Sequence, residues 1–456
     1  MSLKHSCALL AALAVGACSV TPQRGELAPE LPAGFDAAGT ATAPALWWTA
    51  FSDPQLDALT LQALAANPGL QVIEARLRAA RAGTRAAAAG LWPSVSASAS
   101  RTEGFDGGRD NDSSSAGLAA SYEVDLWGRV RARRESAALS AQATAEELQA
   151  AQISLSANVA SLWFRIGTTR RRLELIEQDR ARYARILSLV EQRFRNGQTQ
   201  ASEVLRQRQL LESTQALAAS TRADLGVQRH ALDELLGEPA GRAAYAGAAA
   251  RDLPPVPATG VPAGVVNRRP DVRQSWSQLL AADRDVAAAI ANRFPQLGLD
   301  LTYSSTDAGV AELFDDWIGS LVGSVALPLI DGGARRAEVE RTRAVLDQRV
   351  AAYRQTVLAA FREIQDALLQ DRQQDERVTS LTEQLRLSDA SVERLVTQLR
   401  NGQVEYPSLL EAQVSNSALR RDLLTARQQQ AEFRIALYRA LAGPLPAAPT
   451  SVREPA

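Results

Sequence analysis

The chain has 456 residues, and its 50 Lys and Arg nearly cancel its 51 Asp and Glu, so no strong positive charge points to a nucleic-acid partner. Its two cysteines, Cys7 and Cys18, lie at the N-terminus, and His230 is the one histidine beyond it. A thiolate metal site, a cysteine nucleophile or a usual zinc site is therefore not expected in the body of the chain, and we predict neither a metal, a cofactor nor an enzyme.

The N-terminus predicts a secretory signal. A short apolar run up to Val15 is followed by Gly16 and Ala17, small residues typical of a cleavage site, and then by Cys18. This arrangement resembles a bacterial lipobox, which implies a signal peptide over 1–17, a lipid on Cys18 and, with Ser19 next to it, sorting to the outer membrane. The alternative is a plain signal peptide with an incidental cysteine. Residues 18–52 are interpreted as a lipidated tether.

Helices are predicted over 53–90. Asp53 and Pro54 form a helix start, because Asp can cap the first turn and Pro fits within it, and Asn67-Pro68 divides the segment into two helices. The aromatic residues just before this start, Trp47 and Trp48, are expected to pack in a core rather than bind a ligand.

Two β-hairpins are predicted, over 91–127 and 294–330. Apolar and polar residues alternate in both, most clearly from Gln296 to Tyr303, as in strands with one apolar and one polar face. Each strand has about ten residues, the length of a transmembrane β-strand. The acidic residues Glu123, Asp125 and Asp300 are expected to line the polar inner face of a barrel, and the tryptophans Trp92, Trp127 and Trp317 are expected to form an aromatic girdle.

Two coiled-coil hairpins are predicted, over 128–237 and 332–443. Apolar residues recur at alternating spacings of three and four in both, and the ascending arm of the first would be about 100 Å long at 1.5 Å per residue. Each hairpin turns at the same tetrapeptide, Arg-Asn-Gly-Gln, at 195–198 and at 400–403. Gly readily takes the left-handed conformation that ends a helix, so both arms should stop there.

The order of these signals indicates an internal duplication. Pro68 matches Pro270 at an offset of 202, and the two tetrapeptides match at an offset of 205. Repeat 1 is assigned to 53–237 and repeat 2, which begins with a helix over 267–293, to 267–443. A Pro-, Ala- and Gly-rich linker occupies 238–266, and a tail follows over 444–456. The predicted fold is mixed α and β but mainly α.

Four strands per chain cannot span a membrane alone, because a lone sheet would leave the backbone groups at its two edges unpaired in hydrocarbon. The chain is therefore expected to close with copies of itself, as a β-barrel continuous with an α-helical barrel.

The motifs in this order resemble the TolC-type outer-membrane factors, in particular their lipoprotein efflux branch. The specific motifs are Glu123-Val-Asp-Leu-Trp-Gly-Arg129 and Arg268-Arg-Pro-Asp-Val-Arg273, and the resemblance covers almost all of the mature chain. It implies a homotrimer with a twelve-stranded barrel in the outer membrane of a Gram-negative bacterium, extending into the periplasm. It also implies a passive exit duct for drugs or other small molecules, served by a periplasmic adaptor and by an inner-membrane transporter of the resistance-nodulation-division type, without catalytic residues or cofactor.

The same resemblance implies two kinds of site. The hairpin turns would dock the adaptor, and residues just inside them would form the pore constriction. The docking residues are Arg195, Asn196, Gly197, Gln198, Arg400, Asn401, Gly402 and Gln403. The constriction residues are Glu203, Ser408 and Glu411, although Ser408 and Glu411 stand where relatives carry Asp, and each acid could equally lie on a solvated helix face.

Two other functions stay open at this point. The chain could be the exit duct of a type I protein secretion system. It could also be a lipid-anchored coiled-coil scaffold that conducts nothing, although a scaffold does not need alternating strands with aromatic residues at their ends.

Overall fold

The computed structural model describes residues 27–36, 39, 44–103, 112–242, 244–248, 253–307, 310, 312–401 and 403–446. The predicted signal peptide, Cys18 and Gly402 lie outside this part of the chain. The described residues are mainly helical, with four strands, and the elements recur in a duplicated order. Contacts group the chain into two units, of which unit 1 comprises residues 1–29, 74–147 and 271–357 and unit 2 the remainder.

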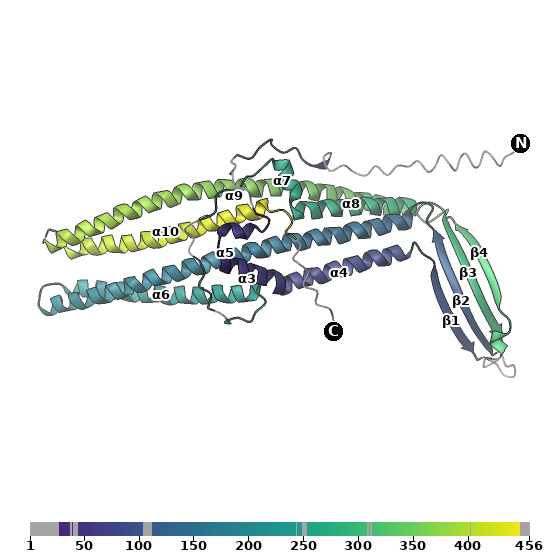
Figure 1. Ribbon diagram of the computed structural model, residues 1–456, viewed down its shortest axis with the longest axis horizontal. Helices are drawn as coiled ribbons and strands as arrows, with labels where there is room; N and C mark the ends of the chain where they lie inside the picture. The colour runs from purple at the N-terminus through teal and green to yellow at the C-terminus, as the bar shows by residue number, and fades with distance from the viewer. Residues whose placement is uncertain are drawn as a thin grey trace. The chain divides into compact units, whose positions relative to one another are not determined.

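Unit 1 contains one antiparallel sheet of strands β1 (Ser94–Thr102), β2 (Ser113–Val124), β3 (Gln296–Asp307) and β4 (Ile318–Ala326), paired in that order (Figure 1). The register aligns Val95, Ala120, Leu301 and Leu321, so apolar residues share one face. Serines gather on the opposite face, where Oγ of Ser94 and Oγ of Ser121 lie 2.8 Å apart. The alternation in the sequence therefore correctly predicted a sheet with one apolar and one polar face.

Residues at the strand ends pack on one another. The rings of Trp127 and Phe294 stack at 4.8 Å, and the Trp127 indole N–H donates to the carbonyl oxygen of Pro295 at 2.7 Å. Tyr303 and Trp317 stack at 5.0 Å.

Asp125 corrects one expectation from the sequence. It lies just beyond β2 and accepts hydrogen bonds from the backbone N–H groups of Val130 (3.0 Å) and Arg131 (2.9 Å), at the start of α5. The first N–H groups of a helix have no partner within the helix, so a carboxylate at this place is stabilising. Asp125 is therefore a helix cap, not a residue of the polar sheet face.

The helices of unit 1 are α4 (Pro68–Ala89), α8 (Pro270–Ala291) and the first parts of α5 (Arg129–Arg195) and α9 (Ala334–Arg400). Helix α4 lies against α5, where Arg76 pairs with Glu147 at 2.6 Å. Helix α8 has partners on two sides, because it bonds α5 and also packs on α9 through the rings of Trp276 and Tyr353, 5.3 Å apart. In the described residues no helix is both long and apolar enough to cross a membrane.

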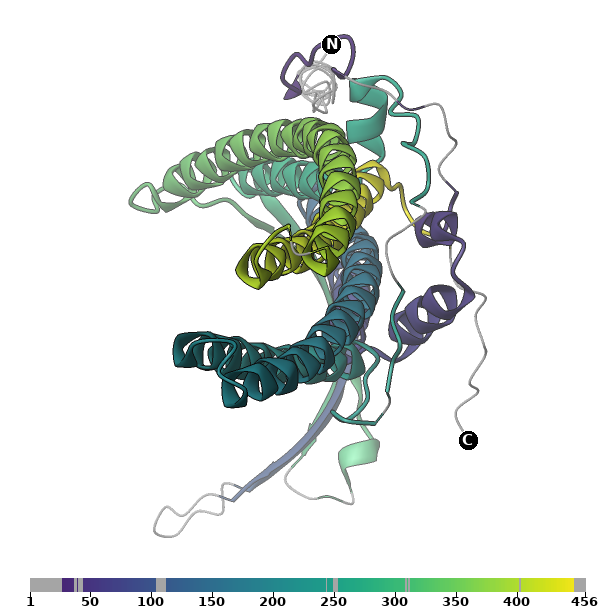
Figure 2. The ribbon, with the colours of Figure 1, turned by 90° about the vertical axis from the view of Figure 1, so that its left-hand side faces the viewer.

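Unit 2 contains two helical hairpins, formed by α5 with α6 (Ala201–Leu235) and by α9 with α10 (Tyr406–Leu441). The short helices η2 (Trp47–Phe51), α3 (Pro54–Ala66) and α7 (Pro262–Arg268) belong to the same unit. Figure 2 shows α5 beside α6 and α9 beside α10.

The core of unit 2 gathers around η2. Trp47 and Trp48 are about 1% and 0% exposed, and the Trp47 indole N–H donates to Oγ of Ser156 at 3.0 Å. The prediction that this aromatic pair serves packing is confirmed. The helix start after it is also as predicted, because Asp53 accepts from the backbone N–H groups of Gln55 (2.9 Å) and Leu56 (3.2 Å).

The connection between the repeats is fixed to α10. Arg434 forms a buried ion pair with Asp371 of α9, at 2.9 and 3.0 Å, and also donates to the carbonyl oxygen of Pro254. The Tyr438 hydroxyl donates to the carbonyl oxygen of Pro255 at 3.2 Å. A guanidinium supplies several donors in a fixed fork, so one side chain can hold both a helix and a connecting segment.

Candidate docking turns and pore residues

The first hairpin turn is built around Gly197. Helix α5 ends at Arg195, and Gly197 has a φ of 70°, in the left-handed region. The N–H of Gly197 donates to the Phe194 carbonyl oxygen and that of Gln198 to the Arg193 carbonyl oxygen, both at 2.9 Å. These bonds satisfy the last carbonyl groups of the helix, as in the glycine-based ends of many helices. The predicted stop at this glycine is confirmed.

The second turn repeats the same outer bond. Helix α9 ends at Arg400, and the N–H of Gln403 donates to the Gln398 carbonyl oxygen at 2.9 Å. In both turns the bond spans five residues, so the identical tetrapeptides close their helices in the same way.

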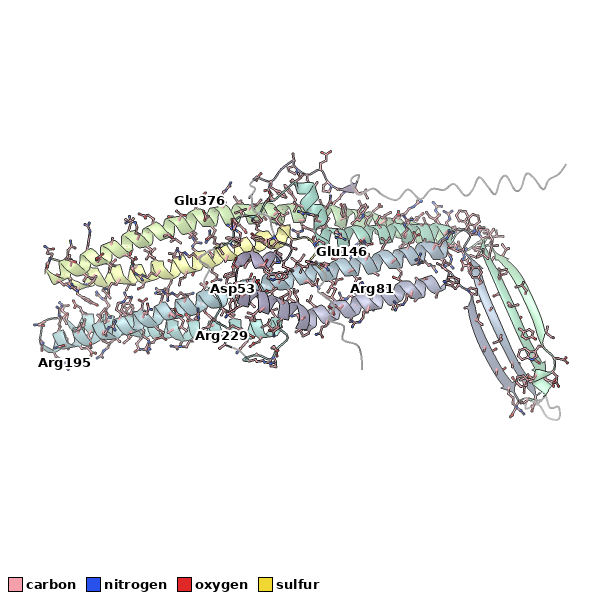
Figure 3. The ribbon with its side chains drawn as sticks, in the orientation of Figure 1. Asp53, Arg81, Glu146, Arg195, Arg229 and Glu376 are labelled. Atoms are coloured by element: carbon pink, nitrogen blue, oxygen red, sulfur yellow. The ribbon has the colours of Figure 1, made fainter. Side chains whose placement is uncertain are left out.

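Both turns are open to solvent. The predicted docking residues within the described chain are all exposed, namely Arg195, Asn196, Gly197, Gln198, Arg400, Asn401 and Gln403. Arg195, labelled at the end of the hairpin in Figure 3, has Nε 3.4 Å from the Glu191 carbonyl oxygen. Phe194 is 46% exposed beside it. The first turn therefore presents guanidinium and amide donors next to an aromatic ring.

Glu203 lies in the first turn of α6 and is half-buried. It accepts a hydrogen bond from the Thr199 hydroxyl, and a carboxylate is stabilised at this end of a helix. Burial raises the pKa of Tyr406, in the first turn of α10, to about 12, with further contributions from Tyr183 and from the charge of Glu203. Glu203 thus has a structural partner in α6 and lies near α10.

The other two predicted constriction residues, Ser408 and Glu411, lie on α10 and are exposed. Glu411 lines a groove of about 600 Å³ between α6 and α10, with Pro407 and Val414 from its own helix and with Arg206 and Leu210 from α6. The three predicted residues are therefore brought to the neighbouring starts of two helices.

Arg206 was missed from the sequence, although the duplication contains the signal. At the offset of 205, Glu203 corresponds to Ser408 and Arg206 corresponds to Glu411. Repeat 1 thus carries an acid and a base at the positions where repeat 2 carries a serine and an acid. The end of the groove is of mixed charge, not purely acidic.

A second feature that the sequence did not reveal is a polar contact between the two hairpins. Asp179 of α5 is about 5% exposed and accepts hydrogen bonds from Ser417 (3.0 Å) and Arg421 (3.2 Å) of α10. Arg182, one turn along α5, bonds it at 2.7 Å. A buried carboxylate is costly unless several donors surround it, and Asp179 has three.

Among the described residues, no group of three or more His, Cys, Asp or Glu side chains has a geometry that could hold a metal ion.

A family model described as outer membrane efflux protein matches residues 59–238 and again residues 262–443. OpmQ of Pseudomonas putida, a pyoverdine export outer membrane protein, is 32% identical over 466 positions, which cover 96% of this chain and 97% of OpmQ. CusC of Escherichia coli O6:H1, a cation efflux system protein, is 27% identical and is covered to 97%, with 95% of this chain. The structure of the Neisseria gonorrhoeae MtrE outer membrane channel in its open state superimposes with a TM-score of 0.83 at 26% identity, over 94% of this chain and 99% of that one.

Proposed function

The chain belongs to the outer membrane efflux protein family, and from this premise we propose that three copies form the exit duct of a tripartite efflux system. The observation that carries the proposal is the four-stranded sheet whose outer strands, β1 and β4, have no further strand beside them in the described chain. Unpaired backbone groups are costly in hydrocarbon, so the sheet is completed by further copies. Three copies give a twelve-stranded barrel.

The partners follow from the ends of the molecule. The exposed turns at 195–198 and 400–403 dock a periplasmic adaptor, because their guanidinium groups can pair with acidic or carbonyl groups. The adaptor connects the duct to an inner-membrane transporter of the resistance-nodulation-division type. A lipid on Cys18 anchors the N-terminus in the outer membrane. Replacing Cys18 by Ala should abolish labelling with a radioactive fatty acid, and undiminished labelling would contradict the anchor.

The cargo is small. OpmQ is named for pyoverdine and CusC for cations, so relatives of similar length serve small molecules of different chemistry. Glu411 and Arg206 would meet the passing solute at the groove between α6 and α10. Copies of Glu411 gathered around one axis favour cations, and Arg206 moderates that preference.

Single-channel recording in a planar bilayer tests the proposal. The purified protein should conduct, and a trivalent cation added on the side of the hairpin turns should block it. We expect Glu411→Ala to weaken this block, Glu203→Ala to weaken it further, and Arg206→Ala to strengthen it. Absence of any conductance would favour the scaffold function. Conductance with an unchanged block in all three variants would place the constriction elsewhere.

A further inference from the structure

The duplication predicts which helices meet at the boundary between two copies. In one chain, α8 is covered on two sides, by α9 of its own repeat and by α5 of the repeat before it. Its counterpart α4 is covered by α5 of its own repeat. The repeat before α4 does not exist in the same chain, so the second face of α4 has no counterpart of the α5 contact.

Two ion pairs define the contact between α8 and α5. Arg273 pairs with Glu146 at 2.6 Å and Arg284 with Glu135 at 3.5 Å. The residues are eleven apart on both helices and run in opposite directions, so the helices are antiparallel in a fixed register. This register places Ala288 opposite Ala132, and both side chains are about 7% exposed. Small residues facing each other allow two helices to approach closely.

The equivalent residues are exposed at the other end of the series. Ala288 corresponds to Ala86 of α4 at the offset of 202, and Ala132 corresponds to Ala337 of α9 at the offset of 205. Ala86 and Ala337 are both exposed, whereas their counterparts are buried. The same change occurs at Ala79, the exposed counterpart of the buried Ala281.

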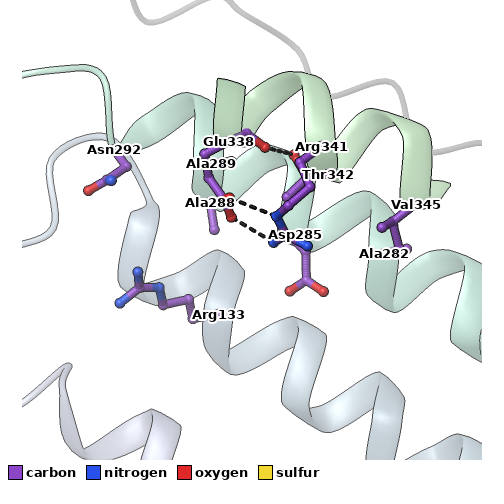
Figure 4. Close-up of a pocket in the computed structure, with 10 residues that line it drawn as sticks. All are labelled: Arg133, Ala282, Asp285, Ala288, Ala289, Asn292, Glu338, Arg341, Thr342 and Val345. Atoms are coloured by element: carbon purple, nitrogen blue, oxygen red, sulfur yellow. Dashed lines mark hydrogen bonds and ion pairs between the residues drawn. The ribbon is translucent and has the colours of Figure 1, made fainter. Parts of the chain in front are cut away.

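A pair of cavities shows the same relation. One cavity of about 550 Å³ lies between α8 and α9 and is closed on the α5 side by Arg133 (Figure 4). Its counterpart, of about 500 Å³, is lined by Ala86 and Ala87 of α4 and by α5 residues. The residue that would close it by equivalence with Arg133 is Glu338 of α9, which lies instead in the wall of the first cavity.

Charges on the two exposed faces are complementary. Arg78 and Arg85 of α4 are exposed and have no ion-pair partner within the described residues, and the same holds for Asp347 of α9. Glu340 of α9, the counterpart of Glu135, is bonded at 3.1 Å to Arg336 through an exposed pair. The two arginines are seven residues apart, and so are the two acids. An antiparallel contact therefore brings Arg85 to Glu340 and Arg78 to Asp347, with the base on the shorter helix, as between α8 and α5.

From these observations we propose that α4 of one chain packs against the first part of α9 of a second copy, as a repetition of the contact between α8 and α5. The alanines at 79 and 86 face those at 344 and 337, and two ion pairs flank them. This proposal rests on the proposed assembly of copies and names the helical surfaces that meet in it.

Disulfide cross-linking in membranes tests the contact. With Ala86→Cys and Ala337→Cys in one chain, mild oxidation should link chains in a ladder that ends at three. The control is the equivalent pair Ala132→Cys and Ala288→Cys, which should link within one chain and show that the register supports a disulfide. No native cysteine lies beyond residue 18 to interfere.

Charge reversal provides the second arm. Arg85→Glu should reduce the yield of the link between chains at least threefold, and adding Glu340→Arg should restore it. Arg81→Glu makes the same charge change about 60° further round α4 and should have a smaller effect. A protein that is trimeric by native mass spectrometry but gives no 86–337 link, while the 132–288 control forms, overturns this contact alone. A protein that stays monomeric overturns the proposed assembly with it.

Discussion

The two hairpins of unit 2 end in the same turn, yet different contacts hold their arms together. Near the first turn, Glu191 of α5 pairs with Arg208 of α6 at 2.6 Å, and Gln207 donates to the Tyr183 carbonyl oxygen at 3.3 Å. In the second hairpin, the polar contact between the arms nearest the turn, among the described residues, involves Asp389, which lies eleven residues before the end of α9.

Burial follows the same division. Helix α5 buries Ile176, Tyr183 and Val190, whereas in α9 no described residue from 375 to 400 is buried. Segments with few buried contacts open locally at a lower free-energy cost. The duplication thus retained the turn but not the packing behind it, and the end of the second hairpin is the more easily opened of the two.

The other end of the second hairpin is held firmly. Asp371 and Arg434 have side chains about 6% and 9% exposed and form a buried, doubly bonded pair. The second hairpin is therefore closed tightly at its base and weakly at its turn, while the first is linked along its length.

The largest effect is expected from breaking that base. Arg434→Ala leaves the Asp371 carboxylate buried without its partner and should lower the free energy of unfolding by about 3 to 5 kcal/mol. Denaturant unfolding measures the change. Arg208→Ala is the control, because it breaks an exposed pair in the first hairpin and should cost less than about 1 kcal/mol. Equal losses in the two variants would contradict the comparison.

The contact between the hairpins should have the next largest effect. Asp179→Ala removes the acceptor of Ser417 and Arg421 and should cost about 1 to 3 kcal/mol, because buried donors lose their partner. Hydrogen exchange should rise in the facing parts of α5 and α10 and stay unchanged around Arg434. A rise spread evenly over unit 2 would show that Asp179 does not act locally.

A substitution in the turn should have a smaller effect on stability. Gly197→Val places a branched side chain at a φ of 70° and should cost about 1 to 2 kcal/mol of local strain. Adaptor binding, measured by surface plasmon resonance, should weaken while membrane insertion is unchanged. Gly402→Val is the matched change in the second hairpin. Undiminished binding in the double variant would mean that the turns do not dock the adaptor.

The smallest effect concerns acidity. Burial alone would raise the pKa of Asp389, but hydrogen bonds from Asn416 and Arg420 hold it below its ordinary value. A carboxyl with a lowered pKa stabilises the folded state at neutral pH and loses that contribution as the pH falls below about 4. Because the group is partly exposed, the loss should be under about 1 kcal/mol.

Hydrogen exchange across α9 and α10 should therefore rise on acidification, and Asp389→Asn should flatten this dependence. Glu177→Gln is the control in the first hairpin. Burial alone would raise the pKa of Glu177, but Arg180 and Arg222 lower it, so this variant should flatten the acid response of α5 and α6 instead. A variant that alters both hairpins equally would argue against separate stabilisation.

The sequence by itself determined the local features of this protein. The helix stop at Gly197, the cap at Asp53 and the apolar face of β3 depend on neighbours a few residues away, and the duplication is visible from spacing alone. An alternating pattern of apolar residues shows that one face of a helix is buried, but it does not show which helix covers that face.

Only the tertiary structure brought Asp179 to Arg421 and Arg206 to the groove of Glu411, because these partners are more than two hundred residues apart in the chain. It also decided the role of Asp125. A carboxylate at the end of a strand suits a polar sheet face as well as a helix cap, and the choice depends on how close the first N–H groups of α5 come to it.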